Sequence, residues 1–420
     1  MLQGKDIVCV SSLDWDAMWT SKQQIMHRLA QANRVLYVEE PVTMLAPLKV
    51  PSRWRRWRAV APRLQRIDAG LWILTPPPML PFGNVRQGIN RTNQAIIARY
   101  LKWALRRLRF DAEYVLWTYL PTSVGLLGRL GAAAGDPEGS AAGRTGSRRA
   151  RARTGGRHPS LVVYHCVDEH SAFPGFVAPD VVKSYDDELT RRADLVITTS
   201  ENLRSSRLPL NPNTHTVLNA ADIEIFNQAL DPDLPLPADL ASIPAPRLGV
   251  VGLHDSRLDI DALECLAGGE EPWQIILVGP IKPAQVDEAR LRRHPNIHLL
   301  GAKPRSELPA YLKGFALALV PYRSNELTRN IFPLKLFEYL AAGLPVVAGG
   351  LPELLRFEGI IGLAGGPGDY PGLVRLALSE DGPEKRAARV TLAAENTWDH
   401  RAEEISRLVE ETLERLAVRS

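Results

Sequence analysis

The residues with the clearest potential for chemistry are Lys335 and Glu338, a cation and a carboxylate three positions apart. Pro333 and Leu334 precede them, and proline suits the first turn of a helix because its missing N–H is not needed there. Positions i and i+3 share one face of a helix. An ammonium and first-turn amides can hold a diphosphate, while a carboxylate accepts hydrogen bonds from ribose hydroxyls. The spacing alone favours an i,i+3 surface salt bridge, with a nucleotide-binding helix as the alternative.

The residues around this pair predict the elements that must position it. Residues 330–350 read N-I-F-P-L-K-L-F-E-Y-L-A-A-G-L-P-V-V-A-G-G. Gly343 suits the left-handed position that ends a helix, and Pro345 prevents the helix from continuing. The apolar residues 346–348 then predict a short buried strand. We therefore expect a loop that begins at Asn330, a short helix, a tight turn and a strand.

This run resembles the nucleotide-binding segment of the group 1 glycosyltransferases with the GT-B fold. It is most similar to members that build bacterial exopolysaccharides and teichuronic acids, a glucuronosyltransferase-like subgroup. The resemblance implies an α/β protein with two Rossmann-like, doubly wound parallel-sheet domains that face each other across a cleft. It also implies a nucleoside-diphosphate sugar, most simply a UDP-sugar, as donor. No cofactor is implied, because the nucleotide sugar is a substrate.

The second half of the chain, residues 247–395, is expected to form the donor domain. Gly252 ends its first predicted strand, where the missing side chain lets a phosphate approach the backbone. Tyr322 follows a later strand and, by the resemblance, lies beneath the base or the sugar. The complete donor set that we expect is Gly252, Tyr322, Asn330, Pro333, Leu334, Lys335 and Glu338.

Two departures from the family pattern leave the stereochemistry open. Many retaining members carry two glutamates eight positions apart; here the second is Glu338, but Asn330 occupies the first position. The Arg and Lys that often follow the first donor-domain strand are also not clearly present, since Arg257 is followed by a leucine. An inverting mechanism, with Asp168 as base and Lys335 on the leaving diphosphate, is therefore open.

A second set of reactive residues follows a predicted strand in the first half. The sequence V-V-Y-H-C-V-D-E-H brings Asp168, Glu169 and His170 to the carboxyl end of an apolar strand, which is where open α/β sheets bind ligands. A carboxylate there can deprotonate an acceptor hydroxyl. Asp168 is the favoured base, with His170 orienting or replacing it, and a helix cap is the alternative. The sequence resembles the Y-x-x-x-D-D/E segment of the exopolysaccharide subgroup.

The first half alternates predicted strands and helices, so residues 1–228 are expected to form a parallel-sheet acceptor domain. Its N-terminal loop offers Asp14 and Trp15 for contact with the acceptor. A linker is predicted at 229–246 from its prolines. The last segment, 396–420, predicts an amphipathic helix that, by the resemblance, packs back on the first domain.

Two basic segments of the first half predict an anionic or amphiphilic partner. Residues 49–66 hold seven cations and no acid, and a helix expected at about 86–109 adds further cations beside Trp103. Cationic faces that carry Trp are typical of elements in a membrane interface. We expect peripheral contact with the inner leaflet; a solvated basic face is the alternative. The residues that carry this expectation most clearly are Trp54, Arg55, Arg56 and Trp57.

Composition excludes several classes of protein. The net charge of +4 arises within residues 131–160, which are rich in Gly, Ala and Arg and predict a disordered insertion. A nucleic-acid-binding tail is not favoured, because no aromatic residues are interleaved. The three cysteines form no CxxC pair, so neither a zinc site nor a disulfide framework is indicated. No run approaches the ~20 apolar residues of a spanning helix, and we expect a cytoplasmic, peripherally membrane-associated protein.

These features favour a metal-independent glycosyltransferase. It would move a sugar from a nucleoside-diphosphate donor to a membrane-associated, lipid-linked or polysaccharide acceptor in cell-surface glycan synthesis. A sugar-nucleotide epimerase or hydrolase on the same fold is one alternative, which would need no basic, Trp-bearing acceptor domain. An inactive nucleotide-binding scaffold is the other, and Asn330 keeps it open. The sequence does not specify the sugar, the acceptor or the oligomeric state.

Overall fold

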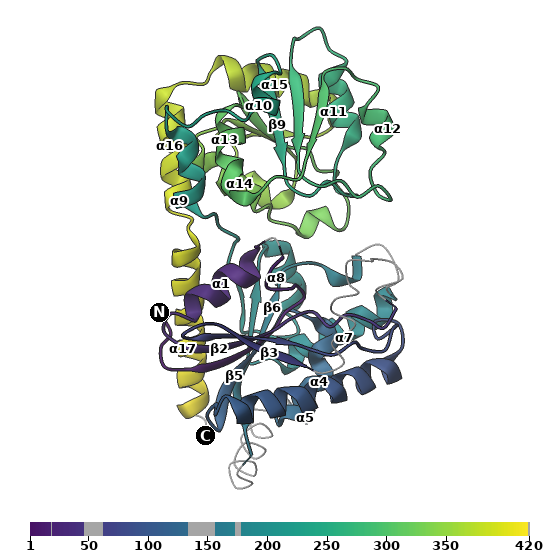
Figure 1. Cartoon of the computed structure of the whole chain (residues 1–420), viewed down its shortest axis with the longest axis vertical. Coiled ribbons are helices and arrows are strands. Elements are labelled where there is room, and N and C mark those ends of the chain that lie inside the picture. Colours follow the sequence, from purple (N-terminus) through teal and green to yellow (C-terminus); the bar gives the residue numbers. More distant parts are fainter. Residues whose placement is uncertain (18, 46–61, 133–155, 173–177, 419–420) are drawn as a thin grey trace. The chain divides into compact units, whose positions relative to one another are not determined.

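The computed structural model describes residues 1–17, 19–45, 62–132, 156–172 and 178–418 (Figure 1). Contacts divide the chain into two compact units. The first unit comprises Met1–Leu218 and Arg401–Ser420, and the second comprises Asn219–His400. Each unit has its own sheet and its own hydrophobic core.

The described part of the first unit contains an eight-stranded sheet in the order β3-β4-β2-β1-β5-β6-β7-β8. Every neighbouring pair is parallel except β3 and β4. The strands are β1 (Asp6–Val10), β2 (Arg34–Val38), β3 (Arg63–Asp68), β4 (Leu71–Thr75), β5 (Glu113–Thr118), β6 (His158–Cys166), β7 (Leu195–Thr198) and β8 (Thr214–Thr216). The central strands are buried apolar runs, as expected where helices cover both faces.

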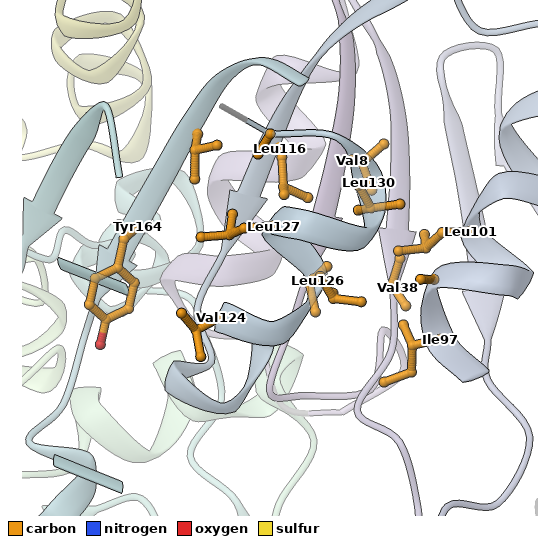
Figure 2. Packing of buried hydrophobic residues seen from close by; sticks show 14 of the residues in the cluster. Val8, Val38, Ile97, Leu101, Leu116, Val124, Leu126, Leu127, Leu130 and Tyr164 are labelled. Carbon is orange, nitrogen blue, oxygen red and sulfur yellow. The ribbon is translucent and has the colours of Figure 1, made fainter. Parts of the chain in front are cut away.

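Helices of this unit pack on the sheet through apolar faces. Figure 2 shows Ile97, Leu101 and the α5 residues Val124, Leu126, Leu127 and Leu130 packed with strand residues such as Val8, Leu116 and Tyr164. The helices and 3₁₀ turns are α1 (Ser21–Leu29), α4 (Gln87–Arg107), η2 (Pro121–Ser123), α5 (Val124–Leu130), η3 (His170–Ala172), α7 (Pro179–Arg192) and α8 (Glu201–Arg207). Because side chains alternate along a strand, the neighbours of these core residues, Trp117 and His165, point to the opposite face.

The second unit contains, in its described residues, a six-stranded parallel sheet in the order β11-β10-β9-β12-β13-β14. The strands are β9 (Arg247–Val251), β10 (Gln274–Val278), β11 (Ile297–Gly301), β12 (Leu317–Val320), β13 (Val346–Gly349) and β14 (Gly362–Ala364). The larger helices are α11 (Ile260–Ala267), α14 (Lys335–Ala341), α15 (Tyr370–Ser379) and α16 (Pro383–Ala394). The shorter ones are α9 (Ile223–Phe226), η4 (Asn227–Leu230), α10 (Ala238–Ala241), α12 (Glu288–Leu291), η5 (Arg305–Glu307), α13 (Leu308–Lys313), η6 (Thr328–Asn330), η7 (Pro352–Phe357) and η8 (Pro367–Asp369). The predicted fold class, two α/β units with parallel sheets, is confirmed.

The segment 229–246 is not the extended linker that its prolines predicted. It contains α10 and is bound to the second unit through side chains. The Asp239 carboxylate accepts hydrogen bonds from Lys303 Nζ at 2.7 Å and from the Tyr311 hydroxyl at 2.9 Å. Lys313 Nζ donates to the Leu234 carbonyl at 2.6 Å. These long-range contacts, which local sequence does not reveal, make the segment part of the second unit.

The contacts that bind residues 219–228 to the second unit explain why this unit begins earlier than the boundary that we expected. Asn219 Nδ2 donates to the Phe332 carbonyl at 2.9 Å. Arg305 lies 3.5 Å from the Asp222 carboxylate. The chain therefore joins the second unit at Asn219, directly after Leu218.

The ends of the predicted insertion at 131–160 are ordered elements of the first unit. Gly131 ends α5 with a left-handed φ of 84°, and His158 begins β6. Residues 133–155, where most of this prediction falls, lie outside the described residues.

The last helix, α17 (Trp398–Val418), begins in the second unit and belongs to the first unit from Arg401 onward. Arg415 Nη2 donates to Asn213 Oδ1 at 2.7 Å, and Asn213 Nδ2 donates to the Thr412 hydroxyl at 3.2 Å. Across the described residues, the structure has no helix whose length and apolar character would suit a membrane span.

Candidate active site

The predicted helix with Lys335 and Glu338 is α14, and the left-handed turn at Gly343 follows it with a φ of 73°. The Tyr339 hydroxyl accepts a hydrogen bond from the Val251 N–H at 2.8 Å. This bond ties α14 to the carboxyl end of β9. The first turn of the helix is thereby held at the edge of the sheet where Gly252 begins the next loop.

Lys335 lies in a buried group at this edge. Lys335 is only 9% exposed. Its Nζ lies 5.0 Å from the centre of the Tyr322 ring. The Arg257 guanidinium lies 5.5 Å from the same ring centre. Gly252 has a φ of 122°, and a Cβ built there would lie 3.3 Å from Lys335 Nζ. The ammonium therefore reaches the end of β9 because Gly252 has no side chain.

The charges in this group leave an excess of positive potential. Burial alone would raise the pKa of Tyr322, but Lys335 and Arg257 together outweigh burial and lower that pKa. Arg257 is paired with Asp255 at 2.8 Å. Lys335 has no ion pair within 4.0 Å among the residues that the structure describes. An anion at this edge of the sheet would meet an uncompensated ammonium.

His254 adds a neutral polar group beside Lys335. Burial, followed by the charge of Lys335, lowers the pKa of His254 to about 3, so the ring is neutral at pH 7. Its Nε2 is buried and has no hydrogen-bond partner in the described part of the chain. Sequence reasoning missed His254, and it noted Arg257 only as a departure from a pattern. Both lie within a few residues of Gly252. Considering every polar residue in the loop after Gly252 would have identified them as candidates.

Glu338 does not form the surface salt bridge that the spacing alone favoured for this helix. No ion pair between Lys335 and Glu338 lies within 4.0 Å, although both are described. Glu338 is half-buried, and burial raises its pKa against the opposing effects of Arg305 and Lys335. Its carboxylate remains available to a ligand on the helix that carries Lys335.

Asn330 and the two residues before Lys335 shape the approach to α14. Asn330 ends η6, and its side-chain amide donates to the Glu326 carbonyl at 2.8 Å. Pro333 is buried and Leu334 is the last residue before the helix. The structure thus groups Gly252, Tyr322 and Lys335 closely, whereas the Asn330 amide is bonded within its own loop.

The three residues predicted after β6 have different surroundings. Glu169 Oε2 accepts a hydrogen bond from Arg207 at 2.8 Å, and Glu169 Oε1 accepts one from the Ser171 hydroxyl at 2.6 Å. Arg207 is buried and also pairs with Asp186 at 2.6 Å. Burial opposes ionisation of Glu169, but Arg207 and Ser171 outweigh it and lower its pKa. Glu169 is therefore engaged in an internal charge network.

Asp168 has no such partner. Its carboxylate is partly exposed and makes no hydrogen bond or ion pair with any described residue. The alternative role as a helix cap is therefore not observed. Burial lowers the pKa of the neighbouring His170 to about 4, against the opposing charge of Asp168. This position therefore combines an Asp168 side chain that has no partner among the described residues with a His170 ring that is neutral at pH 7.

The N-terminal loop packs into the fold and leaves little exposed surface for contact with an acceptor. Trp15 is 6% exposed, and its ring packs edge-on against Tyr37 at 5.1 Å and Trp19 at 5.3 Å. The Asp14 carbonyl accepts a hydrogen bond from Gln23 at 2.9 Å. Trp15 therefore has little area left for the acceptor contact that we expected.

The four residues of the W-R-R-W run, Trp54, Arg55, Arg56 and Trp57, lie outside the described residues. The second basic segment is α4, which contains no acid. Its outer face includes Trp103, 41% exposed. A concavity of about 690 Å³ beside this ring is lined by residues that include Arg99, Lys102, Arg106 and Arg129. These four cations have no ion pair within the described ranges.

Replacing Glu169 and Asp168 one at a time should show which of the two carboxylates contributes to the stability of the fold. Glu169→Gln removes a charged partner of buried Arg207 and is expected to cost about 1–3 kcal/mol of unfolding free energy. Asp168→Asn is expected to change it by less than about 0.5 kcal/mol. Urea denaturation at pH 7 measures both.

The cost of Glu169→Gln also depends on pH. The folded pKa of Glu169 is depressed, so its pairing stabilises the fold above the unfolded value of about 4.3. This contribution is lost as pH falls through the lower folded pKa. The two proteins should therefore converge in stability in acid. Equal urea midpoints for both variants at pH 7 would contradict the assignment.

The sequence of this chain is similar to those of known glycosyltransferases. Residues 253–378 match the family model described as "Glycosyl transferases group 1". The chain is 28% identical over 232 residues to the "Putative teichuronic acid biosynthesis glycosyltransferase TuaH" of Bacillus subtilis (strain 168). That match covers 52% of this chain and 57% of the relative, so the chain spans little more than half the length of the relative it matches.

Solved structures share the fold at low sequence identity. Sucrose-phosphate synthase from Thermosynechococcus elongatus superposes with a TM-score of 0.67 at 14% identity, covering 97% of this chain and 99% of that one. Alr3699/HepE of Anabaena, solved in complex with UDP, gives 0.62 at 13% identity, covering 97% and 100%. At these identities the likeness shows the fold alone. The fold is therefore GT-B, and residues 253–378 are similar to the group 1 glycosyltransferases.

Proposed function

We propose that this protein transfers a sugar from a nucleoside-diphosphate donor, most simply a UDP-sugar, to an acceptor in cell-surface glycan synthesis. The observation that carries the proposal is the buried, unpaired ammonium of Lys335 against Gly252. Burying an unpaired charge is costly, and a diphosphate would compensate it through charge-assisted hydrogen bonds. The UDP complexes of the structurally similar HepE support a uridine nucleotide.

The donor would lie along the edge formed by β9, β12 and α14. Lys335 would hold the diphosphate, and the nearby Arg257 would add positive potential. Glu338 would accept hydrogen bonds from the ribose hydroxyls. Tyr322, beneath both cations, would form the floor. In this proposal, side chains of the chain itself compensate the negative charge of the diphosphate.

In the proposed reaction Asp168 acts as the general base. It takes the proton of an acceptor hydroxyl, whose oxygen attacks the anomeric carbon of the donor sugar. The bond from that carbon to the diphosphate oxygen breaks, and the nucleoside diphosphate leaves with the bonding electrons. Lys335 stabilises the charge that develops on it. Attack from the face opposite the leaving group would invert the anomeric configuration.

The acceptor in this proposal is lipid-linked or otherwise membrane-associated. The outer face of α4 supports this view, since Trp103 is exposed among unpaired cations. A tryptophan with cations suits the interface of an anionic leaflet. The name of the B. subtilis relative, a teichuronic acid biosynthesis enzyme, is in line with a cell-surface glycan. We place the protein in peripheral contact with the inner leaflet.

UDP binding should depend on both charged residues of α14. Lys335→Ala and Glu338→Ala are each expected to weaken UDP binding at least about tenfold, or about 1.4 kcal/mol, because each removes a direct partner of the nucleotide. Calorimetry measures the binding constants. Lys385→Ala, on the exposed face of α16, is the matched control and should bind like the native protein. Equal binding by all four proteins would refute the donor site.

Transfer should depend on Asp168 without a matching effect on donor binding. Asp168→Asn keeps the shape but cannot accept the proton, so the transfer rate should fall about 10²–10⁴-fold. UDP binding by the variant should stay within about twofold of native. Release of UDP from a UDP-sugar in the presence of membrane extract is the readout. A variant that retains full transfer would exclude Asp168 as the base, and hydrolysis without transfer would favour a hydrolase.

Binding to anionic vesicles should depend on α4. Each Lys or Arg near such a surface is worth about 1 kcal/mol, so the double charge reversal Lys102→Glu with Arg106→Glu should lower partitioning at least about tenfold. Sedimentation with phosphatidylglycerol vesicles at low salt measures this. The control, Lys385→Glu, changes charge on another exposed helix. If the native protein stays in the supernatant, the membrane part of the proposal is wrong.

A further inference from the structure

Lys22 is a buried cation in the first unit. It was not among the site residues predicted from the sequence, and it has no role in the proposed reaction. It is the second residue of α1 and is 6% exposed. Its Nζ lies 5.7 Å from the centre of the ring of Tyr119, which follows β5 and is fully buried. No carboxylate of the described residues lies within 4.0 Å of the ammonium. Such a charge costs several kcal/mol to bury unless it meets a partner.

Beside Lys22 lies a histidine whose polar atoms have no partner. His165, near the end of β6, is 1% exposed and stacks on the Tyr119 ring at 4.9 Å with an angle of 29°. Neither of its ring nitrogens, nor the Tyr119 hydroxyl, has a hydrogen-bond partner among the described residues. Buried polar groups are nearly always bonded. The polar atoms of Lys22, Tyr119 and His165 can therefore take a bound species as a partner.

The position of this cluster is that of a ligand site. Lys22 follows β1, Tyr119 follows β5, and His165 and Asp168 lie at the end of β6. These three strands are neighbours in the sheet and parallel, so their carboxyl ends meet at one edge, where open α/β sheets bind ligands. The charge of Asp168 is close enough to oppose the lowering of the Lys22 pKa by burial.

The chemistry of the cluster selects an anion. An ammonium has three donors and no acceptor, a neutral imidazole has one donor, and a phenol can donate one more. Burial and the charge of Lys22 lower the pKa of His165 to about 3, so its ring is neutral. Cys9 is no counter-ion, because burial raises the pKa of its thiol. The cluster offers a positive charge and mostly donors, which suits phosphate oxygens.

We propose that Lys22, with His165 and Tyr119, binds a phosphate group of the acceptor beside the carboxylate of Asp168. The identity of the ligand as the acceptor rests on the proposed function. A phosphate held there would bring the acceptor to the proposed base and compensate the buried ammonium. The phosphate belongs either to a lipid diphosphate or to a phosphorylated sugar without a lipid.

The stability of one variant tests the premise that the ammonium lacks a partner in the fold. Lys22→Met keeps the length of the side chain and removes the buried charge. Its thermal midpoint should equal or exceed that of the native protein, as expected where a residue is retained for binding at a cost in stability. A midpoint several degrees lower would show a structural lysine and overturn the proposal. The same measurement shows that the variant is folded.

Calorimetry with inorganic pyrophosphate and farnesyl diphosphate tests binding. The full chain is first saturated with UDP, which fills the proposed donor site at Lys335. Lys22→Met should weaken pyrophosphate binding at least about tenfold, and Lys22→Arg, which keeps the charge, should weaken it less. Lys183→Met, at an exposed position of α7, is the control and should bind like the native protein. Tighter binding of farnesyl diphosphate would assign the phosphate to a lipid, and equal binding to a sugar phosphate.

Equal binding of pyrophosphate by the native protein and Lys22→Met would overturn the inference, as would no binding of either probe. The UDP titration of the native protein separates this failure from that of the proposed function. A protein that binds UDP but has no Lys22-dependent diphosphate binding retains its donor site and loses only this acceptor site. Lys22→Met itself should bind UDP like the native protein.

Discussion

The group around Lys335 depends on a close backbone contact between two strand ends. Gly279, after β10, has a φ of 144°, and a Cβ built on it would lie 1.8 Å from the Gly252 carbonyl oxygen. Gly252 in turn leaves room for the ammonium of Lys335. Two glycines thus allow β9, β10 and the first turn of α14 to meet. The hydrogen bond between the Val251 N–H and the Tyr339 hydroxyl holds α14 in this arrangement. The ammonium of Lys335 is thereby held beside backbone that carries no side chain.

Charged groups of the same type acquire different roles through what surrounds them. Glu169 and Asp168 are adjacent in sequence, yet Arg207 engages the first and leaves the second free. Arg207 itself is satisfied by two carboxylates, whereas Lys22 and Lys335 are buried with none within 4.0 Å among the described residues. A buried charge costs free energy through its lost hydration, and a partner of opposite charge offsets that cost. The contrast identifies the groups that remain available to a ligand.

Local sequence predicted the elements better than it predicted the neighbours of each charge. Pro333, Gly343 and Pro345 specify where α14 begins and ends, and the apolar runs located the central strands. The pairing of Glu169 with Arg207 joins residues far apart in the sequence, so no local pattern contains it. The burial of Lys22 and His165 follows from tertiary packing in the same way. Residues 229–246 were misread because Asp239 binds Lys303 and Tyr311, which lie well downstream.

The antiparallel strand β3 was also absent from the sequence prediction, because its residues R-L-Q-R-I-D show no buried face and most of them are exposed. It lies at the edge of the eight-stranded sheet and pairs only with β4 in the described part of the chain. An edge strand presents free backbone groups that a strand of another molecule can join. The charges of Arg63, Arg66 and Asp68 would have to lose water in such a pairing. The charged residues of β3 therefore disfavour pairing of this edge with a strand of another molecule.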